Sequence, residues 1–176
     1  MLDISVAYNR FRFIGQEFLT WLWYMIATGR YTDIIDKDKN ISLSIGDRMV
    51  LENRNSKDIE IITIKGNQAD LKEGMVALTK GALVAELSLV IHVNDLPWKL
   101  TLKGESLDMT NLKTPATGRP ETADDLEGAF LEKVHLYETS FHITEQLYHN
   151  FFKQRISSDW DNRIKTKIKT WIETQN

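Results

Sequence analysis

Apolar and polar residues alternate most regularly in the middle of the chain, over residues 82–103. Every second residue from Leu83 to Val93 is apolar, and this period of two predicts a strand with one buried face. Asn94-Asp95 is a turn sequence, after which the alternation resumes over 96–103. The segment is therefore predicted to form a β-hairpin. Its second strand is expected to direct Trp98, Leu100 and Leu102 inward and Lys99, Thr101 and Lys103 outward.

Three other segments have helical spacing. The first, over 13–27, is apolar on all sides, so it must either lie at the centre of the fold or dock on a partner. A second helix is predicted over 67–81. Thr122 with Asp125 is close to a capping box and predicts the start of a long helix that reaches about residue 155. Its expected core-facing stripe is Leu126, Phe130, Val134, Tyr137, Phe141, Tyr148 and Phe151.

The remaining segments complete the predicted architecture. Strands are expected over 41–52, interrupted by a turn at Gly46-Asp47, and over 58–65, whereas 111–121 reads as a long connection. A basic amphipathic helix is predicted over 160–174. Hairpins in place of crossover units favour the α+β class: an antiparallel sheet of about four strands, with helices packed on one face and a long C-terminal helical segment. Residues 1–176 are expected to form a single domain.

Composition excludes several classes of function. The absence of cysteine rules out disulfide frameworks, thiolate zinc sites and cysteine nucleophiles. No apolar run approaches the roughly 20 residues of a membrane span, and no signal peptide is evident, so a soluble, cytoplasmic protein without membrane contact is expected. The sequence also lacks a phosphate-binding glycine loop, a nucleophile elbow and a carboxylate cluster. We therefore predict a protein that is not an enzyme and needs no cofactor.

A regular histidine and glutamate pattern runs along the long helix. His135, Glu138, His142, Glu145 and His149 share one side of it. A metal site is one interpretation, because helical bundles do bind metals through Glu and His. However, the Glu-to-His gap is four residues, and no second Glu/His-rich helix would complete the coordination. A solvated stripe of Glu–His pairs is the favoured interpretation, and no metal is expected.

Basic residues supply the candidate nucleic-acid contacts, although the formal net charge is −3. One group faces outward from the sheet and another lies in the C-terminal tail; solubility of exposed faces is the competing interpretation for both. Among the tryptophans, Trp23 and Trp160 are the two expected to be accessible, and Trp160 beside Arg163 could stack on a base. The candidate set is Lys65, Lys80, Lys99, Lys103, Arg155, Arg163, Lys165, Lys167 and Lys169.

Several strings occur in a recognisable order: FIGQEFLTWLW, ITIKG, LKEGMVALTKGALVAELSLVI, PWKLTLKGESL and DDLEGAFLEKVHLYETSFHITEQLYHNFF. Together they resemble the C-terminal half of the recombination-associated protein RdgC family, over about residues 13–155, with 156–176 as a basic helical tail. The resemblance implies a nucleoid-associated protein that binds duplex DNA without sequence preference, forms ring-shaped dimers and restrains recombinase-driven exchange. Lys80 and Gly81 match a glycine and lysine of the family in reversed order.

Two functions follow as expectations. The first is a non-catalytic, sequence-independent DNA-associated protein of RdgC type. The alternative is a protein-interaction or oligomerisation module without nucleic-acid binding. Because the family's N-terminal half has no counterpart here, the apolar first helix is expected to contact a second copy or a partner protein through the region of Phe18, Trp21 and Trp23.

Overall fold

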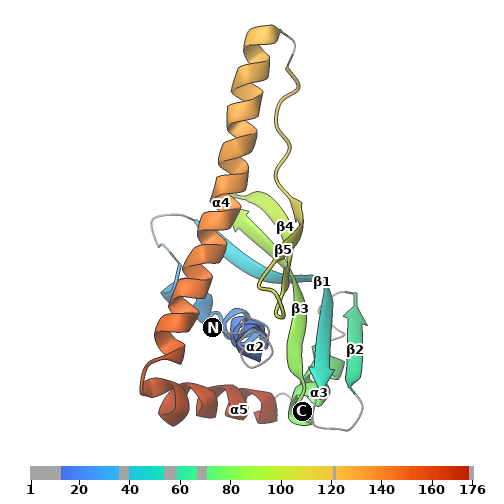
Figure 1. Cartoon of the computed structure of the whole chain (residues 1–176), viewed down its shortest axis with the longest axis vertical. Coiled ribbons are helices and arrows are strands. Elements are labelled where there is room, and N and C mark those ends of the chain that lie inside the picture. Colours follow the sequence, from blue (N-terminus) through green and yellow to red (C-terminus); the bar gives the residue numbers. More distant parts are fainter. Residues whose placement is uncertain (1–12, 36–39, 54–58, 67–70, 121, 175–176) are drawn as a thin grey trace, which may run out of the picture.

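Five strands form one sheet in which every neighbouring pair is antiparallel. The computed structural model describes residues 13–35, 40–53, 59–66, 71–120 and 122–174. The order across the sheet is β2-β1-β3-β4-β5, with helices packed against one face (Figure 1). The predicted α+β class is confirmed. The strands are β1 (Ile41–Asn53), β2 (Glu60–Lys65), β3 (Leu83–Val93), β4 (Leu96–Lys103) and β5 (Met109–Lys113).

Strand β1 is continuous through Gly46-Asp47, so the predicted turn there is wrong. Ile45 pairs with Leu89 and Met49 with Leu87, which leaves three β1 residues opposite a single β3 residue. A Cβ on Gly46 would lie 2.8 Å from the Cβ of Ser88. Glycine is needed at this bulge because the two strands approach closely there, and the strand bends instead of reversing.

The hairpin of β3 and β4 is confirmed. Its register runs from Glu86 opposite Lys103 to Val93 opposite Leu96. Asn94 and Asp95 both have positive φ, at 49° and 67°, as a two-residue turn of type I′ requires. Strand β5 was not predicted, because its short sequence MTNLK carries no clear alternation and lies partly inside the segment expected to be a connection.

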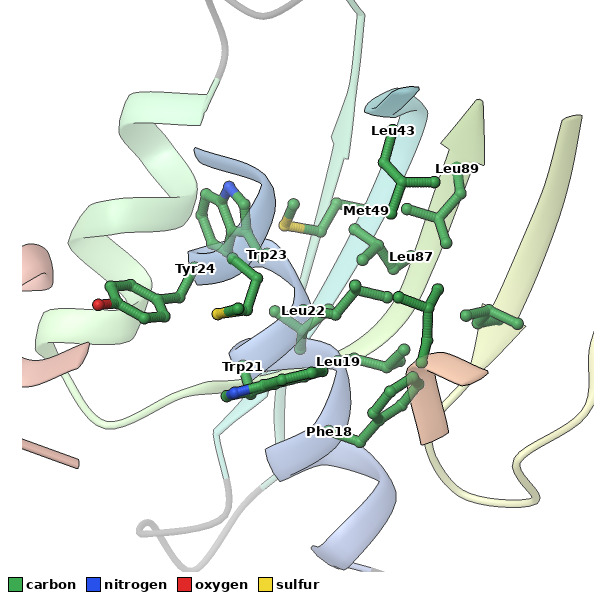
Figure 2. Close-up of a cluster of buried hydrophobic side chains, with 14 of the residues drawn as sticks. Phe18, Leu19, Trp21, Leu22, Trp23, Tyr24, Leu43, Met49, Leu87 and Leu89 are labelled. Atoms are coloured by element: carbon green, nitrogen blue, oxygen red, sulfur yellow. The ribbon is translucent and has the colours of Figure 1, made fainter. Parts of the chain in front are cut away.

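The helical layer is centred on α2 (Phe13–Ala27), which lies between the sheet and the two C-terminal helices (Figure 1). Phe18, Trp21 and Trp23 are at most 1% exposed, and Figure 2 shows them among buried side chains of β1 and β3. The predicted partner contact cannot run through these three side chains, because the fold itself buries them. The remaining helices are α3 (Leu71–Thr79), α4 (Ala123–Arg155) and α5 (Lys165–Thr174), with short turns η1 (Arg30–Asp33) and η3 (Trp160–Ile164).

The C-terminal half of α4 closes the core together with α5. The ring of Phe151 lies 5.4 Å from that of Phe18 and 5.5 Å from those of Trp21 and Trp160. Trp160 is 3% exposed, so the prediction that it and Trp23 are accessible is wrong. The predicted apolar side of the final helix does pack inward, as Trp171 is buried. Aromatic contacts thus join α2, α4 and η3, and the edge-to-face contact of Trp23 with Trp171 joins α2 to α5.

The predicted capping box of α4 is present, since Thr122 and Asp125 exchange hydrogen bonds. The predicted core stripe is wrong along most of its length, because Leu126, Phe130 and Phe141 are exposed. The face that packs against the body is instead Leu136, Ser140, Ile143, Thr144, Leu147 and Phe151. In the described part of the chain, no helix combines the length and apolar character that crossing a membrane requires.

Candidate nucleic-acid interface

The face of the sheet opposite the helices has a shallow hollow over its centre. Side chains that alternate outward on β3 and β4 form its floor, where the Ser88 and Thr101 hydroxyls lie 3.2 Å apart and share a hydrogen bond. The β1 bulge bounds the hollow on one side and β5 on the other. The polar and charged residues that line it are Asp47, Arg48, Lys65, Ser88, Lys99, Thr101, Asn111 and Lys113.

Two pairs of like charges flank this hollow. Arg48 on β1 lies opposite Lys65 on β2, and Lys99 on β4 lies opposite Lys113 on β5. Like charges directly opposite one another on neighbouring strands destabilise a sheet. A surface with two such pairs around one depression is therefore better suited to a bound anion than to empty solvent.

The charge of the hollow differs from that of the whole chain. Four cations and one carboxylate, Asp47, line it, which gives a local sum of +3, against −3 for the entire sequence. Glu86 pairs with Arg48 at 3.4 Å, and Glu73 joins Arg48 and Lys65 in an adjoining hollow. Lys99 and Lys113 are exposed and, among the described residues, have no ion-pair partner. The β4–β5 side is thus the more strongly positive half.

Only part of the predicted basic set converges here. Lys65 and Lys99 line the hollow together, as their outward positions predicted. Lys103 shares the outer face of β4 but is half-buried and lies beyond the lining residues. Lys80 follows the end of α3, where its carbonyl accepts a hydrogen bond from Asn53. It is not among the residues that line the hollow.

Two contributors were missed from the sequence. Arg48 fell next to a predicted turn, and Lys113 fell inside a predicted connection, so neither was assigned to a sheet face. The signal that would have found Lys113 is register, because continuing the antiparallel meander places it opposite Lys99. Arg48 could be found only from the bulge, which no local pattern in the sequence specifies.

Most basic residues of the C-terminal tail form ion pairs with acidic residues one helical turn away. Arg163 bonds Asp159 at 2.8 Å and Lys165 bonds Asp161 at 2.7 Å. The Lys165 ammonium lowers the pKa of the Asp161 carboxyl. Lys169 lies 3.9 Å from Glu173. Lys167 is exposed. These pairs favour the interpretation of a solvated helix face over that of a phosphate-binding patch.

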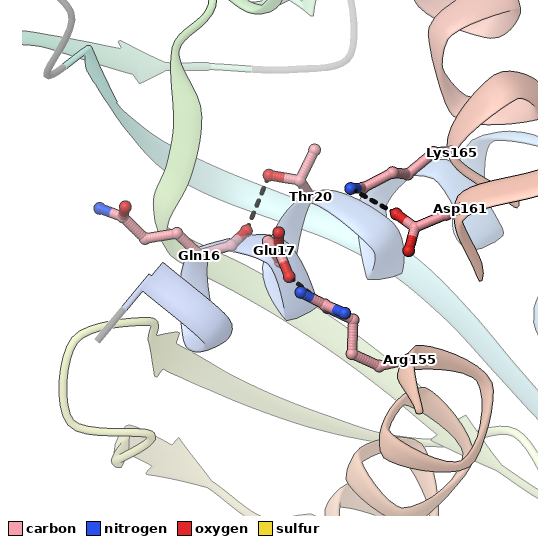
Figure 3. A network of polar contacts seen from close by, with 6 residues as sticks. All are labelled: Gln16, Glu17, Thr20, Arg155, Asp161 and Lys165. Carbon is pink, nitrogen blue, oxygen red and sulfur yellow. Dashed lines mark hydrogen bonds and ion pairs between the residues drawn. The ribbon is translucent and has the colours of Figure 1, made fainter. Parts of the chain in front are cut away.

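The Arg155 side chain forms contacts within the fold and does not extend into solvent. Its Nε donates to the Glu17 carboxylate at 2.6 Å (Figure 3). Its guanidinium also lies over the Trp160 ring, 5.3 Å from the ring centroid. In the same network, the Thr20 hydroxyl donates to the Gln16 carbonyl and accepts from the backbone N–H of Val84 on β3. Arg155 therefore fastens α4 to α2, while Trp160 is too buried to stack on a base.

The histidine and glutamate stripe lies on the surface of α4. His135, Glu138, His142, Glu145 and His149 are all exposed, and the His142 ring is 3.1 Å from the Gln146 amide. Among the residues that the structure describes, no three His, Asp or Glu side chains gather closely enough to hold a metal ion. A separate cleft between α2, α3 and α5 is largely apolar, lined by Trp21, Leu78 and Ile168 among others.

Comparison with known proteins identifies no relative. No family model matches the chain, and neither the curated proteins nor the solved structures contain a significant match. Any function of the hollow must therefore be inferred from its own residues.

Proposed function

We propose that this is a non-catalytic, nucleoid-associated protein that binds DNA phosphates without reading the base sequence. The observation that carries the proposal is the pair of cross-strand cation pairs around the hollow, Arg48 with Lys65 and Lys99 with Lys113. The resemblance of residues 13–155 to the C-terminal half of the RdgC family points in the same direction. The recombination-modulating role of that family belongs to the same proposal.

The chemistry of the hollow suits phosphate oxygens. Lysine ammonium groups act as mobile point charges, which attract a phosphate backbone irrespective of sequence. Thr101 and Asn111 add neutral donors of the kind that bind phosphate and sugar oxygens. The surface is a shallow sheet face, so the proposal assigns it backbone contacts and no insertion into a groove.

The proposal predicts a specific dependence on salt. Neutralising four phosphates gives a slope of about −3.6 in log K against log salt for duplex DNA. Between about 50 and 200 mM salt, the affinity should then fall by roughly two orders of magnitude. Fluorescence anisotropy with a labelled duplex and the matching single strand measures both affinities. A slope close to zero, or no binding at about 50 mM, would overturn the proposal.

A pair of double variants localises the contact. Lys99→Glu with Lys113→Glu reverses both charges on the positive side of the hollow, whereas Lys167→Glu with Lys169→Glu makes the same net charge change on the tail. The first variant should lose at least about 100-fold in affinity, because it removes two phosphate contacts and adds two repulsive charges. The second should lose much less. Equal losses would mean that overall charge, and not the hollow, determines binding.

A further inference from the structure

The cleft between α2, α3 and α5 has the dimensions of a small-molecule site. Its volume is about 370 Å³, and ligand pockets span roughly 300–1,000 Å³. Figure 3 shows three of its lining residues, Glu17 and Thr20 on α2 and Lys165 on α5. Such pockets combine a mainly apolar wall with a few polar groups that orient the ligand. The apolar residues of this wall are Trp21, Leu78, Leu83, Trp160, Ile168 and Ile172.

The charges on the cleft wall are balanced within the chain. Two acidic and two basic residues line the cleft, so their formal charges sum to zero. The ion pairs that they form are Glu17 with Arg155 at 2.6 Å, Lys165 with Asp161 at 2.7 Å and Lys169 with Glu173 at 3.9 Å. A charged ligand would have to break one of these pairs and leave its other member without a partner. The wall therefore favours an uncharged ligand.

The two hydroxyl groups on the wall also have partners. Thr20 donates to the carbonyl of Gln16 at 2.8 Å and accepts from the backbone N–H of Val84 at 3.0 Å. Thr79 donates to the carbonyl of Met75 at 2.9 Å. Both hydroxyl protons are thus already used within the fold.

The indole N–H of Trp160 is the exception. Trp160 is 3% exposed, and its nitrogen has no hydrogen-bond partner among the residues that the structure describes. The ring makes its other contacts through its π-system, edge-to-face with Phe151 and beneath the Arg155 guanidinium. A buried donor without an acceptor destabilises a fold, and native proteins keep such groups rarely. The unpaired N–H therefore indicates that an acceptor from outside the chain belongs at this wall.

The backbone at Trp160 is also unusual. Trp160–Ile164 forms the π-helical turn η3, and turns of this type are rare and frequently lie at functional sites. The turn leads directly into α5, which supplies Lys165 and Ile168 to the wall. Lys165 is exposed and Ile168 half-buried, so these side chains can shift to admit an acceptor to the indole.

We propose that the cleft binds a small, uncharged, apolar molecule with a carbonyl group, and that the Trp160 N–H donates to the carbonyl oxygen. The apolar wall takes up the body of the molecule, and the single unpaired donor fixes its orientation. The cleft belongs to the helical layer, whereas the hollow lies on the opposite face of the sheet. The inference thus goes beyond phosphate binding and does not depend on it.

Prodan, a neutral naphthalene dye with one ketone, is a suitable probe of the cleft. Addition of the chain should shift its emission to shorter wavelength and saturate with one dye bound per chain. Ile168→Trp narrows the cleft and should weaken binding at least about 10-fold. Thr166→Trp adds the same ring at an exposed position outside the wall and should bind like the parent chain. Absence of saturable binding to the parent, or equal binding by the two variants, would overturn the proposal.

Two competitors of nearly the same shape test the hydrogen bond. Acetylnaphthalene has a carbonyl group where ethylnaphthalene has a methylene, and both should displace Prodan from the parent chain. Acetylnaphthalene should bind about 10-fold more tightly, because only its oxygen accepts from the indole. Trp160→Phe removes the donor, so the two affinities should converge in that variant. Equal affinities for the parent chain would refute the assigned hydrogen bond, irrespective of how the variant folds.

Discussion

Replacing Gly15 by alanine tests the closest backbone approach in the core. A Cβ at this position of α2 would lie 1.8 Å from the carbonyl oxygen of Gly104 and 2.8 Å from the Leu107 side chain. Gly104 cannot withdraw easily, because its N–H donates to Ala85 of β3 at 2.7 Å. The added methyl group must therefore push the start of α2 away from the end of β4.

The expected loss follows from two opposing effects. Overpacking a core costs about 1–3 kcal/mol, and the upper end applies here because the obstacle is hydrogen-bonded backbone. Alanine recovers about 0.5–1 kcal/mol of helix propensity, which leaves a net destabilisation of about 2 kcal/mol. For a domain of this size, that corresponds to a melting temperature lower by roughly 4–8 °C.

Gly128→Ala is the matched control, since it makes the same change in α4, where an added Cβ would have no atom within 4 Å. It should leave stability unchanged or raise it by up to about 1 kcal/mol. Urea denaturation followed by tryptophan fluorescence measures both variants. If Gly15→Ala unfolds at the same urea concentration as the parent chain, the inferred contact between α2 and β4 is wrong.

Two further predictions concern Tyr148 and the helix cap. Burial, with a smaller effect from Asp108, raises the pKa of Tyr148 to about 12. The folded state therefore keeps the proton that the unfolded chain loses near pH 10. The contribution of this proton to the free energy of unfolding is complete below pH 10 and is lost as pH rises towards 12. The loss of folding free energy should be on the order of 1–2 kcal/mol after solvent screening. Urea denaturation at pH 9 and pH 11.5 should show this loss in the parent chain but not in Tyr148→Phe. Thr122→Ala should weaken the first turn of α4 by about 1 kcal/mol, because the Asp125 N–H loses its acceptor. Faster hydrogen exchange at that amide would support this, and an unchanged rate would contradict it.

The sheet was predictable wherever alternation was strong. The run of apolar residues in β3 and the Asn94-Asp95 turn determined the hairpin, and Thr122 with Asp125 determined the start of α4. Strand β5 was missed because it is short and has no buried face of its own. The bulge at Gly46 was mistaken for a turn because glycine followed by aspartate is common to both.

The orientation of α4 was misjudged for a different reason. Its buried face contains Ser140 and Thr144, polar residues that hydropathy assigns to the surface. Their hydroxyls donate to the carbonyls of Tyr137 and Ser140 on the same helix, which satisfies them without water. The more apolar stripe with Phe130 and Phe141 therefore looked like the core. In the candidate interface, Lys65 and Lys99 followed from strand alternation, whereas Arg48 and Lys113 required the register between strands.

The distribution of tryptophans gives the molecule two separate optical probes. Trp21, Trp23, Trp160 and Trp171 all lie where the C-terminal segment meets α2 and α4, whereas Trp98 lies on β4 beside Leu136 of α4. Detachment of α5 alone would expose Trp160 and Trp171 to solvent and shift their emission to longer wavelength, while Trp98 remained buried. Movement of the N-terminal half of α4 would instead break the indole hydrogen bond of Trp98 and leave the other four tryptophans unchanged. Intrinsic fluorescence can thus separate motion at the two ends of α4 without any attached dye.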